Sequence, residues 1–137
     1  MKLSNEKYWI WLSLALGYSN RKIKTLFEMY EDISDFYNGG EKEWKFCGIF
    51  SSSDLHNLQK TDLEIAEKIM ERCDEYHYQL IAIDDERYPE CLLNIYNPPA
   101  ILYVEGSLPD VDHILTIGIV GTRTASNYGL KNSYSIG

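Results

Sequence analysis

A run of apolar, largely β-branched residues that ends abruptly at a glycine is the feature that most constrains the fold of this chain. The run covers residues 114–120 and stops at Gly121, and residues typical of a helix follow within a few positions. An uninterrupted apolar run of this length favours a strand that is buried on both faces of a parallel sheet. A glycine at the end of such a strand lets the backbone approach a ligand, and a helix start directs N–H groups at an anion. The stretch therefore predicts a phosphate-binding loop.

The loop matches neither of the common nucleotide-binding signatures. Gly118 and Gly121 do not form the G-x-G-x-x-G pattern of dinucleotide-binding folds, and the chain contains no G-K-[ST] sequence for a P-loop. The guanidinium of Arg123 presents a rigid set of N–H donors that suits a phosphate. Hydroxyl groups lie on either side of Arg123, at Thr122 and Ser126. We therefore predict that Gly121, Thr122, Arg123 and Ser126 together hold one phosphate group.

The composition is that of a globular protein without a membrane span. The chain has 137 residues, of which 45% are hydrophobic and 25% charged, enough for one ordinary domain or two small ones. No apolar run approaches the ~20 residues that a membrane helix needs. Charged residues interrupt the first ten positions, which argues against a signal peptide. We expect a cytoplasmic protein with no membrane partner.

The cysteines and histidines indicate no metal or cofactor. There are three cysteines, an odd number, and no C-x-x-C spacing, so a disulfide framework and a zinc site are both disfavoured. Cys73 and His77 stand four residues apart on an expected helix, a spacing that suits a metal. Because the sequence shows no second pair of ligands, we interpret both as structural or solvated residues.

The net charge of the chain is negative, but the charges are unevenly distributed along the sequence. The formal net charge is −8, which by itself argues against a nucleic-acid partner. After Asp112, however, no acidic residue occurs, and Arg123 and Lys131 give that segment a charge of +2. Because the local charge acts on an approaching phosphate, the C-terminal segment remains compatible with DNA.

Sequence periodicity predicts a helical first part. Apolar residues at helical spacing mark residues 1–78 as a helical N-terminal domain. The expected helices cover about 5–16, a segment after residue 19, 33–38, 41–47, 53–59 and 61–76, with Ser4, Ser19 and a capping box of Thr61 with Glu64 as start signals. Gly39 and Gly40 interrupt the series.

From residue 79 the pattern changes to strands. Apolar runs at 80–83, 101–104 and 114–120 predict three strands, with a short helix after Tyr88 and Pro89. Strands that alternate with helices favour an α/β fold with a mainly parallel sheet, so we assign residues 79–137 to the beginning of a second domain. The chain stops inside the helix expected after the third strand, and we therefore expect it to be the N-terminal part of a longer protein.

Two longer motifs follow one another in the chain: Tyr88-Pro89-x-x-Leu92-x-x-Ile95-x-x-Pro98-Pro99-x-x-Leu102-Tyr103-x-x-Gly106 and Val120-Gly121-Thr122-Arg123-x-x-Ser126-x-Tyr128-Gly129. Together they resemble the DNA-processing protein A family (DprA, also called Smf). The resemblance implies a sterile-alpha-motif-like helical domain followed by the truncated start of an extended Rossmann-like domain that binds single-stranded DNA. It further implies a role in natural transformation, in which the protein protects incoming DNA and loads the RecA recombinase, and a homodimer in the full-length protein.

The resemblance also assigns roles to single residues. The family's Gly-Ser-Arg phosphate loop falls on Gly121, Thr122 and Arg123, where threonine replaces serine and keeps the hydroxyl. Ser126 matches the second hydroxyl of that motif. Tyr128 and Lys131 are further candidates for DNA contact. The ring of Tyr128 can stack on a base, although it could equally pack the following helix against the strand. No catalytic residue is implied, and the mechanism expected is binding.

Two alternatives stay open. The first is a Rossmann-like enzyme that binds a nucleotide with the same loop, although no acid, histidine or cysteine follows the loop to act as base or nucleophile. The second is an inactive fragment whose helical domain serves only as an interaction module.

Overall fold

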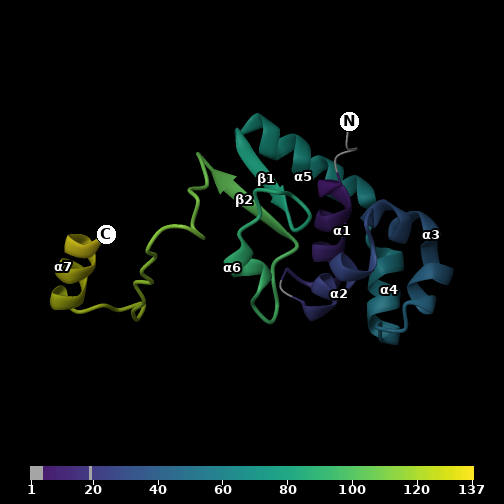
Figure 1. Cartoon of the computed structure of the whole chain (residues 1–137), viewed down its shortest axis with the longest axis horizontal. Helices are drawn as coiled ribbons and strands as arrows, with labels where there is room; N and C mark the ends of the chain where they lie inside the picture. The colour runs from purple at the N-terminus through teal and green to yellow at the C-terminus, as the bar shows by residue number, and fades with distance from the viewer. Residues whose placement is uncertain (1–4, 19) are drawn as a thin grey trace.

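The computed structural model describes residues 5–18 and 20–137, which form seven helices and a two-stranded sheet (Figure 1). The elements are α1 (Glu6–Leu16), α2 (Arg21–Met29), α3 (Ile33–Phe46), α4 (Ser52–Lys60), α5 (Leu63–Glu75), β1 (Tyr78–Ala82), α6 (Glu90–Leu93), β2 (Ile101–Glu105) and α7 (Asn127–Ile136). Within the described ranges, no helix is both long and apolar enough to cross a membrane. The mainly helical first part is as the sequence predicts.

Side-chain caps fix where the helices begin. Ser51 and Asp54 form a reciprocal capping box at the start of α4, which the sequence analysis did not anticipate. The side chain of Asp62 accepts the N–H of the second residue of α5 at 3.0 Å, so the predicted cap at Thr61 is wrong by one residue. The predicted caps Ser4 and Ser19 lie outside the described residues.

The glycine pair interrupts α3 as predicted. Gly40 has φ 62° and ψ −156°, a conformation that only glycine adopts readily, and the helical path is kinked there. The halves on either side correspond to the two helices expected at 33–38 and 41–47. A local backbone requirement was therefore visible in the sequence.

The sheet differs from the predicted parallel arrangement. β1 and β2 pair antiparallel, with Tyr78 opposite Glu105 and Ala82 opposite Ile101. A parallel pair needs a crossover that carries the chain back along the full strand, usually a helix. The connection here contains only α6, which has four residues, and β2 begins beside the end of β1. The predicted mainly parallel sheet is therefore wrong for the strands that the structure describes.

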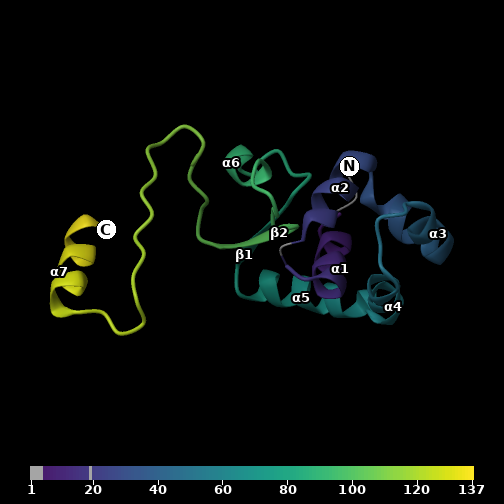
Figure 2. The same ribbon diagram turned by 90° about the horizontal axis from the view of Figure 1, so that it is seen from below.

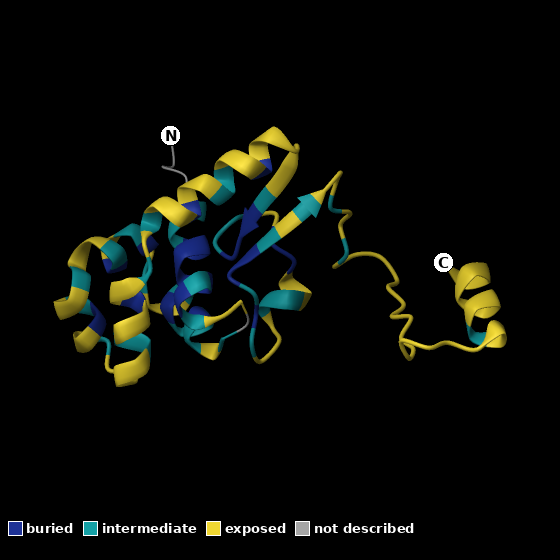
Figure 3. Cartoon of the chain, turned by 180° about the vertical axis from the view of Figure 1, so that it is seen from behind, coloured by how far each residue is buried: buried dark blue, intermediate teal, exposed yellow. Residues whose placement is uncertain are grey.

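One hydrophobic core joins the helices to the sheet, and α1 lies at its centre. α1 contacts α3, α4, α5 and both strands, and its residues are mostly buried (Figure 3). The Trp11 indole packs against Trp44 with ring centroids 5.5 Å apart and donates a hydrogen bond to the Thr61 carbonyl at 2.9 Å. On the sheet side, Ile81 and Ala100 belong to the same core. The helical part therefore supports the hairpin directly.

The C-terminal segment lies apart from this core. Figures 1 and 2 both show the chain leaving β2 as an extended segment that ends in α7, away from the other helices. Residues 114–120 form no strand, and the side chains of Leu115 and Val120 are 92% and 94% exposed. The predicted buried third strand is therefore wrong in this structure, because the run pairs with no strand among the described residues.

Candidate nucleic-acid interface

The predicted loop leads directly into a helix, as expected. Ser126 is the N-cap of α7, and its hydroxyl oxygen accepts the N–H of Gly129 at 3.2 Å. Its carbonyl accepts the N–H of Leu130 at 3.0 Å. The first N–H groups of any helix have no partner within the helix, and they carry the positive end of its dipole. The start of α7 is therefore suited to an anion.

The two loop hydroxyls are placed differently. The Thr122 hydroxyl donates to the carbonyl of Thr124 at 2.8 Å, which closes a small turn inside the loop. Its hydrogen is thereby engaged with the chain. The Ser126 hydroxyl acts as an acceptor in the cap and keeps its own hydrogen for donation. Of the two, Ser126 is the better placed to donate to a phosphate in this conformation.

The remaining predicted contacts are open to solvent. Arg123 and Lys131 are both exposed, and the Tyr128 side chain is 80% exposed. No atom lies within 4 Å of the place where a Cβ would stand at Gly121, so the backbone there is accessible from outside. The structure thus presents the predicted cations and the aromatic ring on the same short segment around the start of α7.

The carboxylates that precede the loop are engaged elsewhere. Asp110 lies 2.9 Å from Nδ1 of His113, and this contact raises the pKa of that imidazole. Asp112 accepts the N–H groups of Cys91 at 2.8 Å and Glu90 at 2.7 Å, and these bonds lower the pKa of its carboxyl group. Asp112 therefore ties the C-terminal segment to the start of α6, a role that no sequence signal indicated.

The described side chains offer no metal centre. Throughout residues 5–18 and 20–137, no group of three or more histidine, cysteine, aspartate or glutamate side chains is placed to hold an ion. The arrangement around Arg123 consists of a cation, backbone N–H groups and hydroxyls. Such a set can bind and orient an anion.

A second group of residues escaped the sequence analysis. Arg21 and Lys24 on α2 line one groove with Tyr96, which belongs to the turn between α6 and β2. The pattern that marks them is only a short basic cluster, and Tyr96 lies 75 positions after Arg21 in the chain. Only the tertiary structure brings these side chains together.

Comparison with known proteins finds a family match for the second part of the chain. Residues 79–137, which include the loop, match the family described as DNA recombination-mediator protein A. The DNA processing protein DprA of Bacillus subtilis (strain 168) is 43% identical over 49 residues, which cover 36% of this chain and 16% of that protein. No solved structure is significantly similar to the chain. Residues 79–137 are thus similar to the DNA recombination-mediator protein A family, and the stretch shared with the B. subtilis protein spans only about a sixth of that protein's length.

Proposed function

We propose that this chain binds single-stranded DNA through the loop before α7 and thereby takes part in DNA processing and recombination. The observation that carries the proposal is the joint presence of Arg123, the Ser126 cap and the α7 N-terminus in a segment with no acidic residue after Asp112. The family match covers this segment, and the B. subtilis relative is named as a DNA processing protein. The proposal extends to DNA uptake in natural transformation, with RecA as protein partner, a homodimeric full-length form and a cytoplasmic location.

The contacts available determine the mode of binding. Backbone N–H groups, the Ser126 hydroxyl and the Arg123 guanidinium are donors that suit a phosphate, and phosphate contacts carry no sequence information, so binding should tolerate any sequence. Tyr128 is exposed on the first turn of α7 and can stack on a base without selecting it. Lys131, further along the same helix, adds a second positive charge. Binding should therefore weaken steeply as salt is added.

The test is a salt series of single-stranded oligonucleotide binding, followed by fluorescence anisotropy. We expect Arg123→Ala to weaken binding to all sequences about equally and to lower the slope of log K against log salt by about one. Lys42→Ala is the matched control, because Lys42 is an exposed cation on α3, far from α7 (Figure 2). An unchanged slope in the Arg123 variant, with both variants folded, would remove the loop from the interface.

The same samples distinguish the nucleotide-enzyme alternative. Purified chain is incubated with nucleoside triphosphates and Mg²⁺, and released phosphate is measured. If the chain releases phosphate and Arg123→Ala does not, the proposal of DNA binding would be wrong and the loop would serve a nucleotide-hydrolysing site. We expect none above background.

A further inference from the structure

A short basic cluster opens α2. Arg21, Lys22 and Lys24 occur within four residues, and no acidic residue interrupts the chain until Glu28. The positive end of the α2 dipole lies at the same place. Positive potential therefore concentrates at the start of this helix, although the chain as a whole is acidic.

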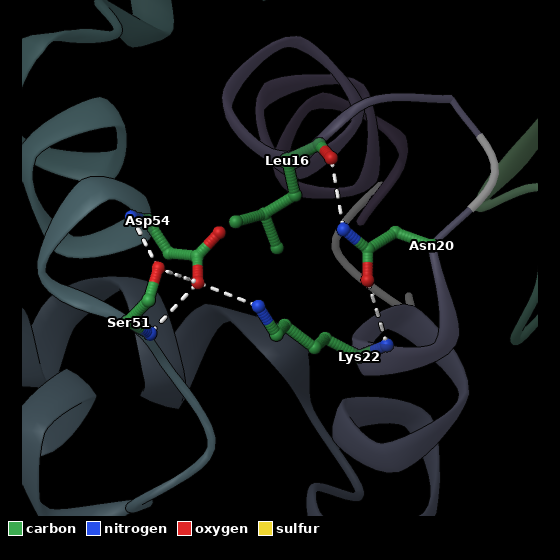
Figure 4. A network of polar contacts seen from close by, with 5 residues as sticks. All are labelled: Leu16, Asn20, Lys22, Ser51 and Asp54. Carbon is green, nitrogen blue, oxygen red and sulfur yellow. Dashed lines mark hydrogen bonds and ion pairs between the residues drawn. The ribbon is translucent and has the colours of Figure 1, made fainter.

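The three cations of this cluster are not equivalent. The Lys22 ammonium forms an ion pair with Asp54 of α4 at 2.5 Å, and the Ser51 hydroxyl donates to the same carboxylate (Figure 4). Asn20 caps the helix, since its side chain accepts the Lys22 N–H at 3.0 Å and donates to the Leu16 carbonyl at 2.9 Å. These contacts fix the start of α2 and neutralise Lys22. Two cations remain for another partner.

Those two cations line a groove of about 320 Å³ between α2 and the turn after α6. Arg21, Lys24, Thr25 and Glu28 form one wall, and residues 94–96 form the other. The lining includes two cations and one carboxylate, that of Glu28, so its net charge is +1. No described residue forms an ion pair with Lys24. The groove is thus both cationic and accessible.

An aromatic ring is held at the edge of the groove. The Arg21 guanidinium carbon lies 5.2 Å from the centroid of the Tyr96 ring, and Nη1 donates to the Tyr96 hydroxyl at 3.3 Å. The Tyr96 side chain nevertheless remains 71% exposed. An exposed ring beside a guanidinium is the combination on which the bases and phosphates of single strands bind.

The turn that carries Tyr96 is anchored on both sides. The N–H of Ile95 donates to the carbonyl of Leu92 at 3.3 Å, so the turn continues from α6. Pro98 is fully buried, and the Tyr88 hydroxyl donates to the carbonyl of Pro99 at 2.7 Å. The ring is therefore presented from a fixed backbone, which lowers the entropy lost when a ligand binds.

From these observations we propose that the groove between α2 and residues 94–96 binds one nucleotide unit of single-stranded nucleic acid, separately from the loop before α7. The base stacks on Tyr96, and the adjoining phosphate contacts Arg21 and Lys24. A volume of about 320 Å³ lies at the small end of ligand sites, which suits one nucleotide better than a longer segment. The ligand class rests on the proposed function, whereas the place and the residues rest on this groove alone.

The experiment measures binding of fluorescein-labelled oligothymidylate to the full chain and to Tyr96→Leu, Arg21→Ala and Lys42→Ala. Tyr96→Leu removes the platform and should weaken binding about five- to tenfold. Arg21→Ala should weaken binding and lower the salt slope by about one, while the control Lys42→Ala stays within twofold. With an abasic oligonucleotide, the chain and Tyr96→Leu should bind alike, because no base is present to stack. Circular dichroism of each variant confirms that it is folded.

The Arg123→Ala variant, measured in parallel, separates this proposal from the proposed function. Loss of binding in Arg123→Ala with unchanged binding in folded Tyr96→Leu and Arg21→Ala would overturn the groove and leave the loop. The reverse pattern would support the groove and reject the loop. If thymidine monophosphate displaces the oligonucleotide only in chains that retain Tyr96, and binds as tightly as the strand, the groove is a free-nucleotide site and the strand proposal is wrong.

Discussion

The hydroxyl of Tyr88 offers a sharp test of how the turn before β2 is held. It donates a hydrogen bond of 2.7 Å to the carbonyl of Pro99, and its ring is buried in the core beside the sheet. Tyr88→Phe removes the hydroxyl and preserves the ring. A hydrogen bond of this kind contributes about 0.5–1.5 kcal/mol net, and an acceptor left unpaired in the interior costs about 1–3 kcal/mol. Because Pro99 is only partly buried, water can reach its carbonyl, and we expect a loss of about 1 kcal/mol.

Urea unfolding followed by circular dichroism measures this loss. The midpoint should fall while the dependence of the unfolding free energy on urea stays constant, because the surface exposed on unfolding is unchanged. Tyr103→Phe is the matched control. The Tyr103 ring lies at the outer part of the sheet, and no hydrogen bond joins its hydroxyl to another described residue, so its effect should stay within about 0.5 kcal/mol. Equal losses in the two variants would refute the assigned role of the Tyr88 hydroxyl.

The pH dependence of the same difference gives a second, independent check. Burial raises the pKa of Tyr88 to about 12. In the unfolded chain the phenol ionises near its ordinary pKa of about 10, so between these values the unfolded state holds fewer protons than the folded state. The stability that Tyr88 contributes is therefore complete below about pH 10 and declines as the pH rises to about 12, by on the order of 2 kcal/mol. The Tyr88→Phe variant should lose less stability over this window, and an identical decline in both proteins would contradict the argument.

Three further substitutions test other parts of the structure. Trp11→Phe removes the hydrogen bond to the Thr61 carbonyl and leaves unfilled space in the core. Urea unfolding should show that the free energy of unfolding falls by about 2–3 kcal/mol. A fall below about 0.5 kcal/mol would mean that the indole is not held by this hydrogen bond and its packing. Gly40→Ala places a Cβ at φ 62° and should cost about 1–3 kcal/mol, whereas Gly118→Ala, with no atom within 4 Å of its Cβ, should be neutral; equal effects would exclude the backbone explanation. Asp112→Ala should speed hydrogen exchange of the Glu90 and Cys91 amides, because Asp112 accepts their N–H groups in the wild type. Because those bonds lower the pKa of Asp112, the wild type should show the same faster exchange as the pH falls below about 4. Exchange rates that depend on neither the substitution nor this protonation would disprove the role of Asp112 in holding the start of α6.

Local features of the fold followed from the sequence closely. Apolar periodicity located the helices of the first part, and the apolar runs at 80–83 and 101–104 correspond to β1 and β2. The glycine pair marked the kink in α3, because an unusual φ is a property of one residue. The start of α7 after the loop was predicted as well. These features depend on interactions between residues within a few positions of one another.

Pairing between distant segments was not predictable in the same way. The run at 114–120 has the composition of a strand, but a strand also needs a neighbour that accepts its backbone hydrogen bonds. The direction of β2 relative to β1 depended on the path of the connection, and an α6 of only four residues did not carry the chain back for parallel pairing. Composition reports the preference of a segment and contains no information about its partner.

The candidate sites divide along the same line. The sequence by itself predicted the loop before α7 as a site, since Gly121, Arg123 and Ser126 lie within six residues and the proposed site needs only a following helix start. The groove with Arg21 and Tyr96 was decided only by the tertiary structure. Those two side chains are 75 positions apart, and they meet because the shared core holds α2 and the turn after α6 in place. Local structure depends on residues that are neighbours in the sequence, whereas contacts between distant residues form only when the core has folded.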